Sequence, residues 1–260
     1  MGRRAARRSD DASPFLLRLQ LVRERIEHPN QYPFSIPAVA AVDGLSLHPR
    51  VTYFVGENGS GKSTLLEAIA IGAGFNPEGG SMNFRFTTRS SESSLARALR
   101  LVRSARRPRT GFFLRAESFF NLATTIEHLD REPGSGPPVI ASYGGRSLHE
   151  QSHGESFIAL ALHRFGPDGL YVLDEPEAAL SPLRQMSMLR RMHDLVREGC
   201  QFIVATHAPI LLAYPEAWIY QLDEHGLRKV AYDDTSTVRV TREFLSDRER
   251  TLGDLFSEDP

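Results

Sequence analysis

The sequence predicts an α/β domain in which helices flank a largely parallel central sheet. In the second half of the chain helix-like and strand-like segments alternate, and upstream a short apolar strand leads through a glycine-rich loop into a helix. Such alternation is typical of βαβ units, whose parallel strands are connected through helices. Strands are expected within 15–26 and over 51–55, 110–114, 170–173, 201–205, 217–222 and 227–230, and helices over 63–73, 95–104, 157–164 and 182–197.

The hydrophobic pattern supports each of these elements. Residues 15–26 alternate apolar and polar side chains in their second half, as a half-buried or edge strand does. Short continuous apolar runs, such as 170–173 and 201–205, predict buried strands. In 63–73 the residues Leu65, Leu66 and Ile69 recur with helical spacing, which predicts a helix with one apolar face.

Composition excludes several classes of protein. Of the 260 residues 41% are hydrophobic and 24% are charged, and the formal net charge of −1 gives no overall field that would select nucleic acid or a membrane surface. The single cysteine, Cys200, cannot form an internal disulfide, which fits a reducing cytoplasm. Apolar runs fall short of the roughly 20 residues of a membrane span, and the arginine-rich start lacks the apolar segment of a secretory signal. A cytoplasmic protein without membrane insertion is expected.

A glycine-rich loop carries the strongest chemical signal. Residues 56–64 match G-x-x-x-x-G-K-[ST] in full, with a predicted strand before and a predicted helix after. Glycines let the backbone wrap round a phosphate, Lys62 would reach the β- and γ-phosphates, and the Ser63 hydroxyl would contact Mg²⁺. The alternative is a glycine-rich turn with an incidental lysine. The predicted binding residues are Gly56, Glu57, Asn58, Gly59, Ser60, Gly61, Lys62, Ser63 and Thr64.

Polar residues follow two of the predicted buried strands. Asp174 and Glu175 emerge after 170–173, and His207 follows 201–205. Ligands bind beyond the carboxyl ends of strands in open α/β sheets, so these residues could face the phosphate loop. There Asp174 would hold Mg²⁺ through water, Glu175 would orient or deprotonate the attacking water, and His207 would bond the γ-phosphate or that water. The alternatives are a plain strand-end turn for the acids and a structural role for the histidine.

These motifs, with "QSHGES" between them, resemble the ABC ATPase superfamily in content and order. The stretches "FFLRAESFFN", "SLHEQSHGES" and "LDEPEAALSP" are similar to small stand-alone bacterial members of its soluble branch, which includes SMC-like and RecF-like ATPases. The resemblance covers most of the chain. It implies a P-loop NTPase fold of the ABC type, with a mostly parallel sheet flanked by helices and an N-terminal antiparallel β region.

The resemblance implies roles for further residues. Ser152, Gly154 and Glu155 match the signature motif, which in this family contacts the γ-phosphate held by a second protomer. Residues 178–181 match the loop that communicates across such a dimer, although Ser181 stands where many relatives carry aspartate. The family's magnesium-sensing glutamine is missing, and Glu117 is the candidate replacement, with an ordinary exposed glutamate as the alternative. For the aromatic residue that stacks on adenine, Tyr32 and Phe34 are both candidates, and a core role is the alternative for each.

The expected organisation has three parts. Residues 1–12 read as a disordered basic tail by composition. Residues 13–235 would form the ABC-type ATPase domain, with a short loop-rich and helical lobe at about 76–150, and residues 236–260 a C-terminal helical extension. The short lobe is unlike the larger helical lobe of a transporter ATPase.

The function implied by the resemblance is hydrolysis of ATP with Mg²⁺ by a homodimer that forms on ATP binding. Lys62, Glu175 and His207 would be catalytic, and Ser63, Asp174 and Glu117 would serve the metal. Closure and opening of the dimer would act on DNA or on a partner protein. The alternatives are the cytoplasmic ATPase subunit of a transporter and a nucleotide-dependent switch that does not hydrolyse ATP.

An arginine stripe leaves the question of DNA open. Arg97, Arg100, Arg103 and Arg106 repeat every third residue, which would place them near one face of the helix expected over 95–104. Such a face could contact a phosphate backbone without reading the base sequence. A solvated helix face is the alternative.

Overall fold

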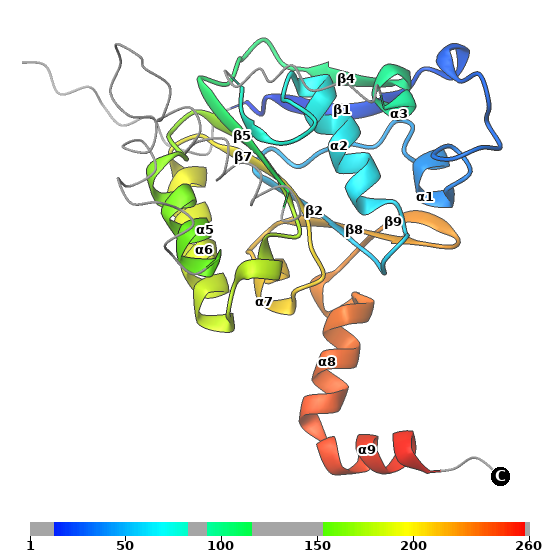
Figure 1. The fold of residues 1–260 in the computed structure, drawn as a ribbon, viewed down its shortest axis with the longest axis vertical. Coiled ribbons are helices and arrows are strands. Elements are labelled where there is room, and N and C mark those ends of the chain that lie inside the picture. The colour runs from blue at the N-terminus through cyan, green and yellow to red at the C-terminus, as the bar shows by residue number, and fades with distance from the viewer. Residues whose placement is uncertain (1–12, 83–92, 116–152, 258–260) are drawn as a thin grey trace, which may run out of the picture.

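The computed structural model describes residues 13–82, 93–115 and 153–257 (Figure 1). Its strands are β1 (Leu16–Leu21), β2 (Val51–Val55), β3 (Gly80–Ser81), β4 (Leu99–Arg103), β5 (Thr110–Arg115), β6 (Gly169–Asp174), β7 (Gln201–Ala205), β8 (Trp218–Asp223) and β9 (Gly226–Val230). Its helices are η2 (Arg23–Arg25), α1 (Pro37–Ala40), α2 (Lys62–Ala73), α3 (Ser94–Ala98), α5 (His153–His163), η4 (Pro176–Ala179), α6 (Pro182–Arg197), α7 (Pro209–Leu212), η5 (Tyr232–Asp234), α8 (Ser236–Ser246) and α9 (Arg248–Phe256).

A mostly parallel sheet forms the centre of the molecule. Within the described residues seven strands pair in the order β3-β5-β6-β7-β2-β8-β9. The five inner strands are mutually parallel, and β3 and β9 join the two edges antiparallel. The prediction of a mostly parallel α/β fold is confirmed.

Two apolar layers cover the two faces of this sheet. Along β6, Leu170 and Val172 pack into one core cluster, whereas Tyr171 and Leu173 pack into the other. Successive side chains of a strand point to opposite faces, so a strand buried on both faces has a continuous apolar sequence. Helix α2 covers one face, and α5 and α6 cover the other (Figure 1).

A small antiparallel sheet lies beyond α2, as expected for the N-terminal region. Strands β1 and β4 pair from Leu16 to Leu21, and Leu101 of β4 packs close to Gly72 of α2. Helix α2 therefore lies between the two sheets (Figure 1). The carboxyl end of β2 and the start of α2 are thus held between packed layers.

The prediction of a helix over 95–104 is wrong. Helix α3 ends at Ala98, and the next five residues form β4. Buried Leu99 and exposed Arg100 begin an alternation with the period of a strand, and β1 supplies the pairing partner that a local pattern cannot reveal. The four arginines therefore form no helical stripe, and Arg106 bonds the carboxylate of Asp168 and the carbonyl of Gly199.

Helices α8 and α9 extend away from the sheet (Figure 1). Val238 is buried, whereas Val240, Leu245, Leu255 and Phe256 are exposed apolar residues. Among the described residues, no helix has the length and apolar character needed to cross a membrane.

Candidate nucleotide site

The predicted phosphate loop connects β2 to α2. Gly56 follows β2, and a Cβ atom there would lie 2.3 Å from the carbonyl oxygen of Leu222 in the neighbouring strand β8. Gly59 and Gly61 have φ angles of +83° and +96°, a region that residues with a side chain rarely adopt. Glycine is therefore required at position 56 by packing and favoured at the other two positions by conformation.

The loop folds around the ammonium group of Lys62. Its side chain is only 3% exposed, and Nζ donates to the carbonyl oxygens of Gly56 at 2.7 Å and Glu57 at 3.0 Å. Nζ also lies 3.9 Å from Oε1 of Glu175. Burying a charge is costly unless polar partners replace water, so these three contacts explain how the ammonium is tolerated here.

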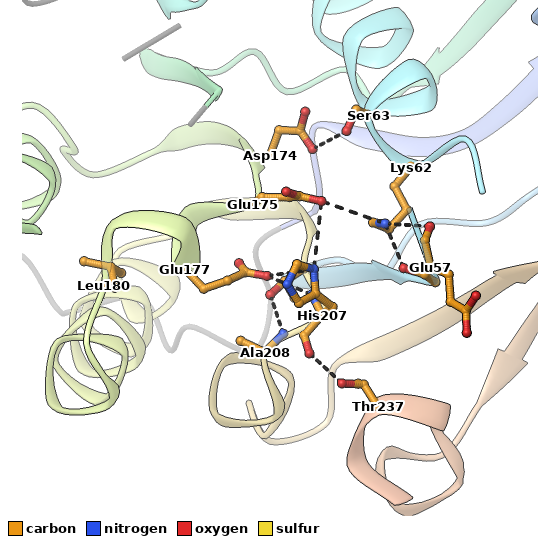
Figure 2. A network of polar contacts seen from close by, with 12 residues as sticks. Glu57, Lys62, Ser63, Asp174, Glu175, Glu177, Leu180, His207, Ala208 and Thr237 are labelled. Atoms are coloured by element: carbon orange, nitrogen blue, oxygen red, sulfur yellow. Dashed lines mark hydrogen bonds and ion pairs between the residues drawn. The ribbon is translucent and has the colours of Figure 1, made fainter. Parts of the chain in front are cut away.

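Ser63 and Asp174 meet beneath the loop. The Ser63 hydroxyl at the start of α2 donates to Oδ1 of Asp174 at 3.1 Å (Figure 2). Burial raises the pKa of Asp174 to about 6, while the Ser63 hydrogen bond and the charge of Arg115 oppose that rise. A buried carboxylate beside a hydroxyl offers the oxygen ligands that Mg²⁺ prefers, so these residues fit that ion. Glu117, the third predicted metal residue, lies outside the described residues.

Glu175 lies next to the lysine in an unusual backbone conformation. Its φ and ψ are 49° and 52°, in the left-handed region, and its amide donates to Ala205 of β7 at 2.9 Å. Such conformations are costly for residues other than glycine and cluster at functional sites. The turn brings the Glu175 carboxylate, which is partly exposed, between Lys62 and His207 (Figure 2).

His207 reaches the same group of side chains from the end of β7. Its Nδ1 atom lies 3.9 Å from Oε1 of Glu175 and 3.5 Å from Oε1 of Glu177, and its side chain is 52% exposed. Strand β7 lies between β6 and β2 in the sheet. The segments that follow these three parallel strands therefore meet at the carboxyl ends of the strands. The predicted residues Lys62, Glu175 and His207 are therefore brought together.

Two residues near His207 were missed by the sequence analysis. Oε1 of Glu177 accepts a hydrogen bond from the His207 backbone amide at 2.8 Å, and the Thr237 hydroxyl donates to the His207 carbonyl at 2.7 Å. Glu177 could have been suspected as a third acid, because only Pro176 separates it from the Asp174-Glu175 pair. No local signal singles out Thr237, because it is 30 residues from His207.

Two known proteins resemble the chain at moderate identity. The hemin import ATP-binding protein HmuV of Pseudomonas aeruginosa is 27% identical over 184 residues, which are 64% of this chain and 71% of that protein. The "Putative ribose/galactose/methyl galactoside import ATP-binding protein 1" of Rhizobium etli is 26% identical over 196 residues, 66% of this chain. The chain spans only 37% of the length of that second relative.

Two family models match separate parts of the chain. The model described as "AAA domain" matches residues 40–104, which contain the loop with Lys62. The model described as "AAA domain, putative AbiEii toxin, Type IV TA system" matches residues 142–213, which contain Asp174, Glu175 and His207. Together with these relatives, the two matches support a P-loop ATPase of the ABC type.

Solved structures similar to this chain include an ABC transporter and an SMC head domain. One is a metal-chelate type ABC transporter in an inward-facing conformation, with 15% identity, a TM-score of 0.49, and coverage of 87% of this chain and 88% of that one. Another is the SMC head domain of Thermotoga maritima, with 18% identity, a TM-score of 0.37, and coverage of 72% and 91%.

The residues that match the signature motif are described only in part. Ser152 lies outside the described residues, and Gly154 and Glu155 lie in the first turn of α5. A Cβ atom on Gly154 would be 2.6 Å from both the Ala179 carbonyl oxygen and Nη1 of Arg184, and Glu155 pairs with Arg184 at 3.1 Å. Helix α5 covers the face of the sheet opposite α2, so these residues start on the other side from Lys62 (Figure 1).

The structure separates the two candidates for contact with adenine. Phe34 is 9% exposed and packs in the core cluster of α2. Tyr32 is 72% exposed, and its hydroxyl is hydrogen-bonded to that of Thr64 at 3.0 Å. A cavity of about 420 Å³ is lined by Tyr32, Pro33, Ser63, Thr64, Glu67, Ser93, Ser94 and Arg115. Phe34 is therefore a core residue, and Tyr32 remains as the candidate.

Proposed function

We propose that this ATPase hydrolyses ATP by in-line attack of water on the γ-phosphate. The observation that carries the proposal is the meeting of Lys62, Glu175 and His207 from three separate segments. Oε1 of Glu175 lies 3.9 Å from Nζ of Lys62 and 3.9 Å from Nδ1 of His207. A cation, a carboxylate and an imidazole beside such a loop can bind the phosphates, orient the attacking water and accept its proton.

Each of these residues has a distinct role in the proposed reaction. Lys62 binds the β- and γ-phosphates and meets the charge that develops on them. Glu175 orients the attacking water and accepts its proton, and His207 bonds a γ-phosphate oxygen or the same water. Asp174 and Ser63 would hold Mg²⁺, which when bound neutralises negative charge on the phosphates. Glu117 is proposed as a further residue at the metal.

Nucleotide binding is proposed to extend from the loop to Tyr32. The hydrogen bond between Tyr32 and Thr64 places the phenol ring beside the cavity next to α2. An exposed aromatic ring there can stack on the purine, whereas buried Phe34 cannot. The backbone amides of residues 56–64 would hold the phosphates.

Turnover is proposed to require two copies of the chain. Gly154 and Glu155 begin α5 on the face of the sheet opposite α2, so Ser152, Gly154 and Glu155 of one copy could complete the Lys62 site of another. A helix start with free amides is suited to binding an anion such as the γ-phosphate. Binding of ATP would then join two copies into a homodimer, and hydrolysis would separate them.

The proposed output is movement of a partner protein or of DNA in the cytoplasm. The arginines that suggested DNA do not share a helix face, so that argument for DNA no longer holds. The relatives named as import ATP-binding proteins favour a second candidate, the ATPase subunit of a transporter. Co-purification with a membrane-spanning protein would support that candidate, and a monodisperse ATPase without such a protein would count against it.

The experiment that tests hydrolysis is a comparison of phosphate release by the wild-type chain and the Glu175→Gln variant. Loss of turnover with retention of ATP binding supports the enzyme. Unchanged turnover would contradict both the role of Glu175 as the base and hydrolysis at this site.

A further inference from the structure

The backbone of His207 is held from both sides by side chains that the proposed reaction does not use. Oε1 of Glu177 accepts from its amide at 2.8 Å, and the Thr237 hydroxyl donates to its carbonyl at 2.7 Å (Figure 2). Glu177 lies in η4, two residues after Glu175, whereas Thr237 is the second residue of α8. Two elements far apart in sequence thus fix one peptide segment.

Burial makes the Glu177 contact unusual. Its side chain is 7% exposed, and its Oε2 atom has no hydrogen-bond partner among the described residues. A buried carboxylate is costly, and a buried polar atom without a partner is uncommon in folded proteins. The contacts that offset this cost are with His207, through its amide and through Nδ1 at 3.5 Å.

This arrangement determines how the imidazole is presented. A carboxylate beside Nδ1 favours a proton on that atom, because the N–H then points to a negative charge. Glu175 lies 3.9 Å from the same Nδ1 atom, so both carboxylates act on one side of the ring. The Nε2 atom remains for the γ-phosphate or the attacking water.

We propose that Glu177 and Thr237 are positioning residues that set the place and the tautomer of His207 during hydrolysis. The inference rests on the proposed function, because His207 matters only if ATP is hydrolysed at this site. It also connects α8 to the reaction, since any movement of the start of α8 would be transmitted through Thr237 to the His207 carbonyl. Helices α8 and α9 thereby become a route by which a partner could control turnover.

The test for Glu177 is a double-mutant cycle with His207. Glu177→Ala is expected to lower kcat by about tenfold to a hundredfold with little change in KM, because the reacting group is misplaced while ATP still binds. Glu177→Gln keeps an oxygen for the amide and should recover most of that loss. In a His207→Ala background, Glu177→Ala should have no further effect on kcat. An equal loss in both backgrounds would overturn the proposal.

The test for Thr237 uses a matched pair of substitutions. Thr237→Val removes one hydroxyl hydrogen bond and should lower kcat by about threefold to tenfold. Thr251→Val is the control, because the Thr251 hydroxyl donates to the Asp247 carbonyl at 2.8 Å on α9, away from the site. Equal kcat values for the two variants would contradict the role of Thr237, and with it the connection between α8 and hydrolysis.

A spectroscopic measurement separates failure of this inference from failure of the proposed function. The imidazole ¹⁵N shifts of His207, assigned by their loss in His207→Ala, report its tautomer without turnover. They should change in Glu177→Ala and stay constant in Glu243→Ala, an exposed site on α8. If the wild-type chain does not hydrolyse ATP, the proposed function fails. Unchanged shifts in Glu177→Ala would contradict the positioning role whether or not ATP is hydrolysed.

Discussion

At the scale of single residues, the site gathers opposite charges where water is partly excluded. Lys62 is buried against loop carbonyls and Glu175, and Asp174 is buried against Ser63. Burying a charged group costs free energy. That cost is smaller when the group is neutral or when an ion of opposite charge binds beside it. The apo site should therefore be less stable than a version without its buried acid.

Asp174→Asn is expected to stabilise the protein without nucleotide or divalent ions at neutral pH. Burial raises the pKa of Asp174 from 3.8 to about 6, so the folded state binds more protons than the unfolded state between these values. The free energy of unfolding contributed by this group therefore falls as pH rises through that range. The variant should gain about 1–3 kcal/mol at pH 7.5 and much less at pH 4.5, measured by urea unfolding.

The matched control is Asp254→Asn, an exposed aspartate on α9. It should leave the free energy of unfolding unchanged at both pH values. A stability gain for Asp174→Asn that is the same at pH 4.5 and pH 7.5 would contradict the assignment of the effect to ionisation.

Tyr32→Ala is expected to weaken ATP binding without loss of the fold. Stacking of an aromatic ring on a base contributes about 1–3 kcal/mol, so the dissociation constant should rise by roughly tenfold. Tyr32→Phe keeps the ring and should bind nearly as well, losing only the contact with Thr64. Titration with a fluorescent ATP analogue measures the difference, and equal affinity of all three proteins would remove Tyr32 from the site.

At the scale of elements, local patterns predicted most strands and helices but not their partners. Helix α6 and strand β7 have the predicted bounds, because their patterns are long or wholly apolar. The segment 95–104 failed because its arginine spacing suggested a helix, whereas pairing with β1 decided the outcome. Glu177 was missed for the same reason, since its role depends on β7 bringing the His207 amide to it.

Gly56→Ala tests the close packing of the phosphate loop on β8. The added Cβ atom would lie 2.3 Å from the Leu222 carbonyl oxygen, so the loop must shift. The free energy of unfolding should fall by about 1–3 kcal/mol, and ATP binding should be lost. Gly253→Ala is the control, because a Cβ there has no neighbour within 4 Å and should stabilise α9 by about 0.5–1 kcal/mol. Equal unfolding curves for the two variants would contradict the packing argument.

At the scale of the whole molecule, the sequence predicted the fold and the type of ATPase more fully than the assembly. Polar residues after the predicted strands indicated which strand ends could face the phosphate loop, and the sheet order confirms the mostly parallel α/β fold. The place where a second copy would bind depends on surfaces formed by several elements. Local sequence carries little information about such surfaces, so the dimer remains a prediction.

Ser152→Arg tests the proposed dimer. A bulky side chain at the start of α5 should spare ATP binding to one copy but block a second copy from approaching. In a Glu175→Gln background, light scattering with ATP should show dimers that are absent after Ser152→Arg. With Glu175 intact, turnover should fall by about a hundredfold, because the signature groups no longer reach the γ-phosphate. Undiminished turnover would leave Ser152 with only a structural role.

The most direct test of the central claim is the rate of phosphate release by Glu175→Gln, measured beside its affinity for ATP. The substitution keeps the size of the side chain but removes the carboxylate that lies between Lys62 and His207. Hydrolysis at this site predicts a fall in turnover of about a hundredfold or more, with ATP affinity nearly unchanged. Turnover equal to that of the wild-type chain would contradict it.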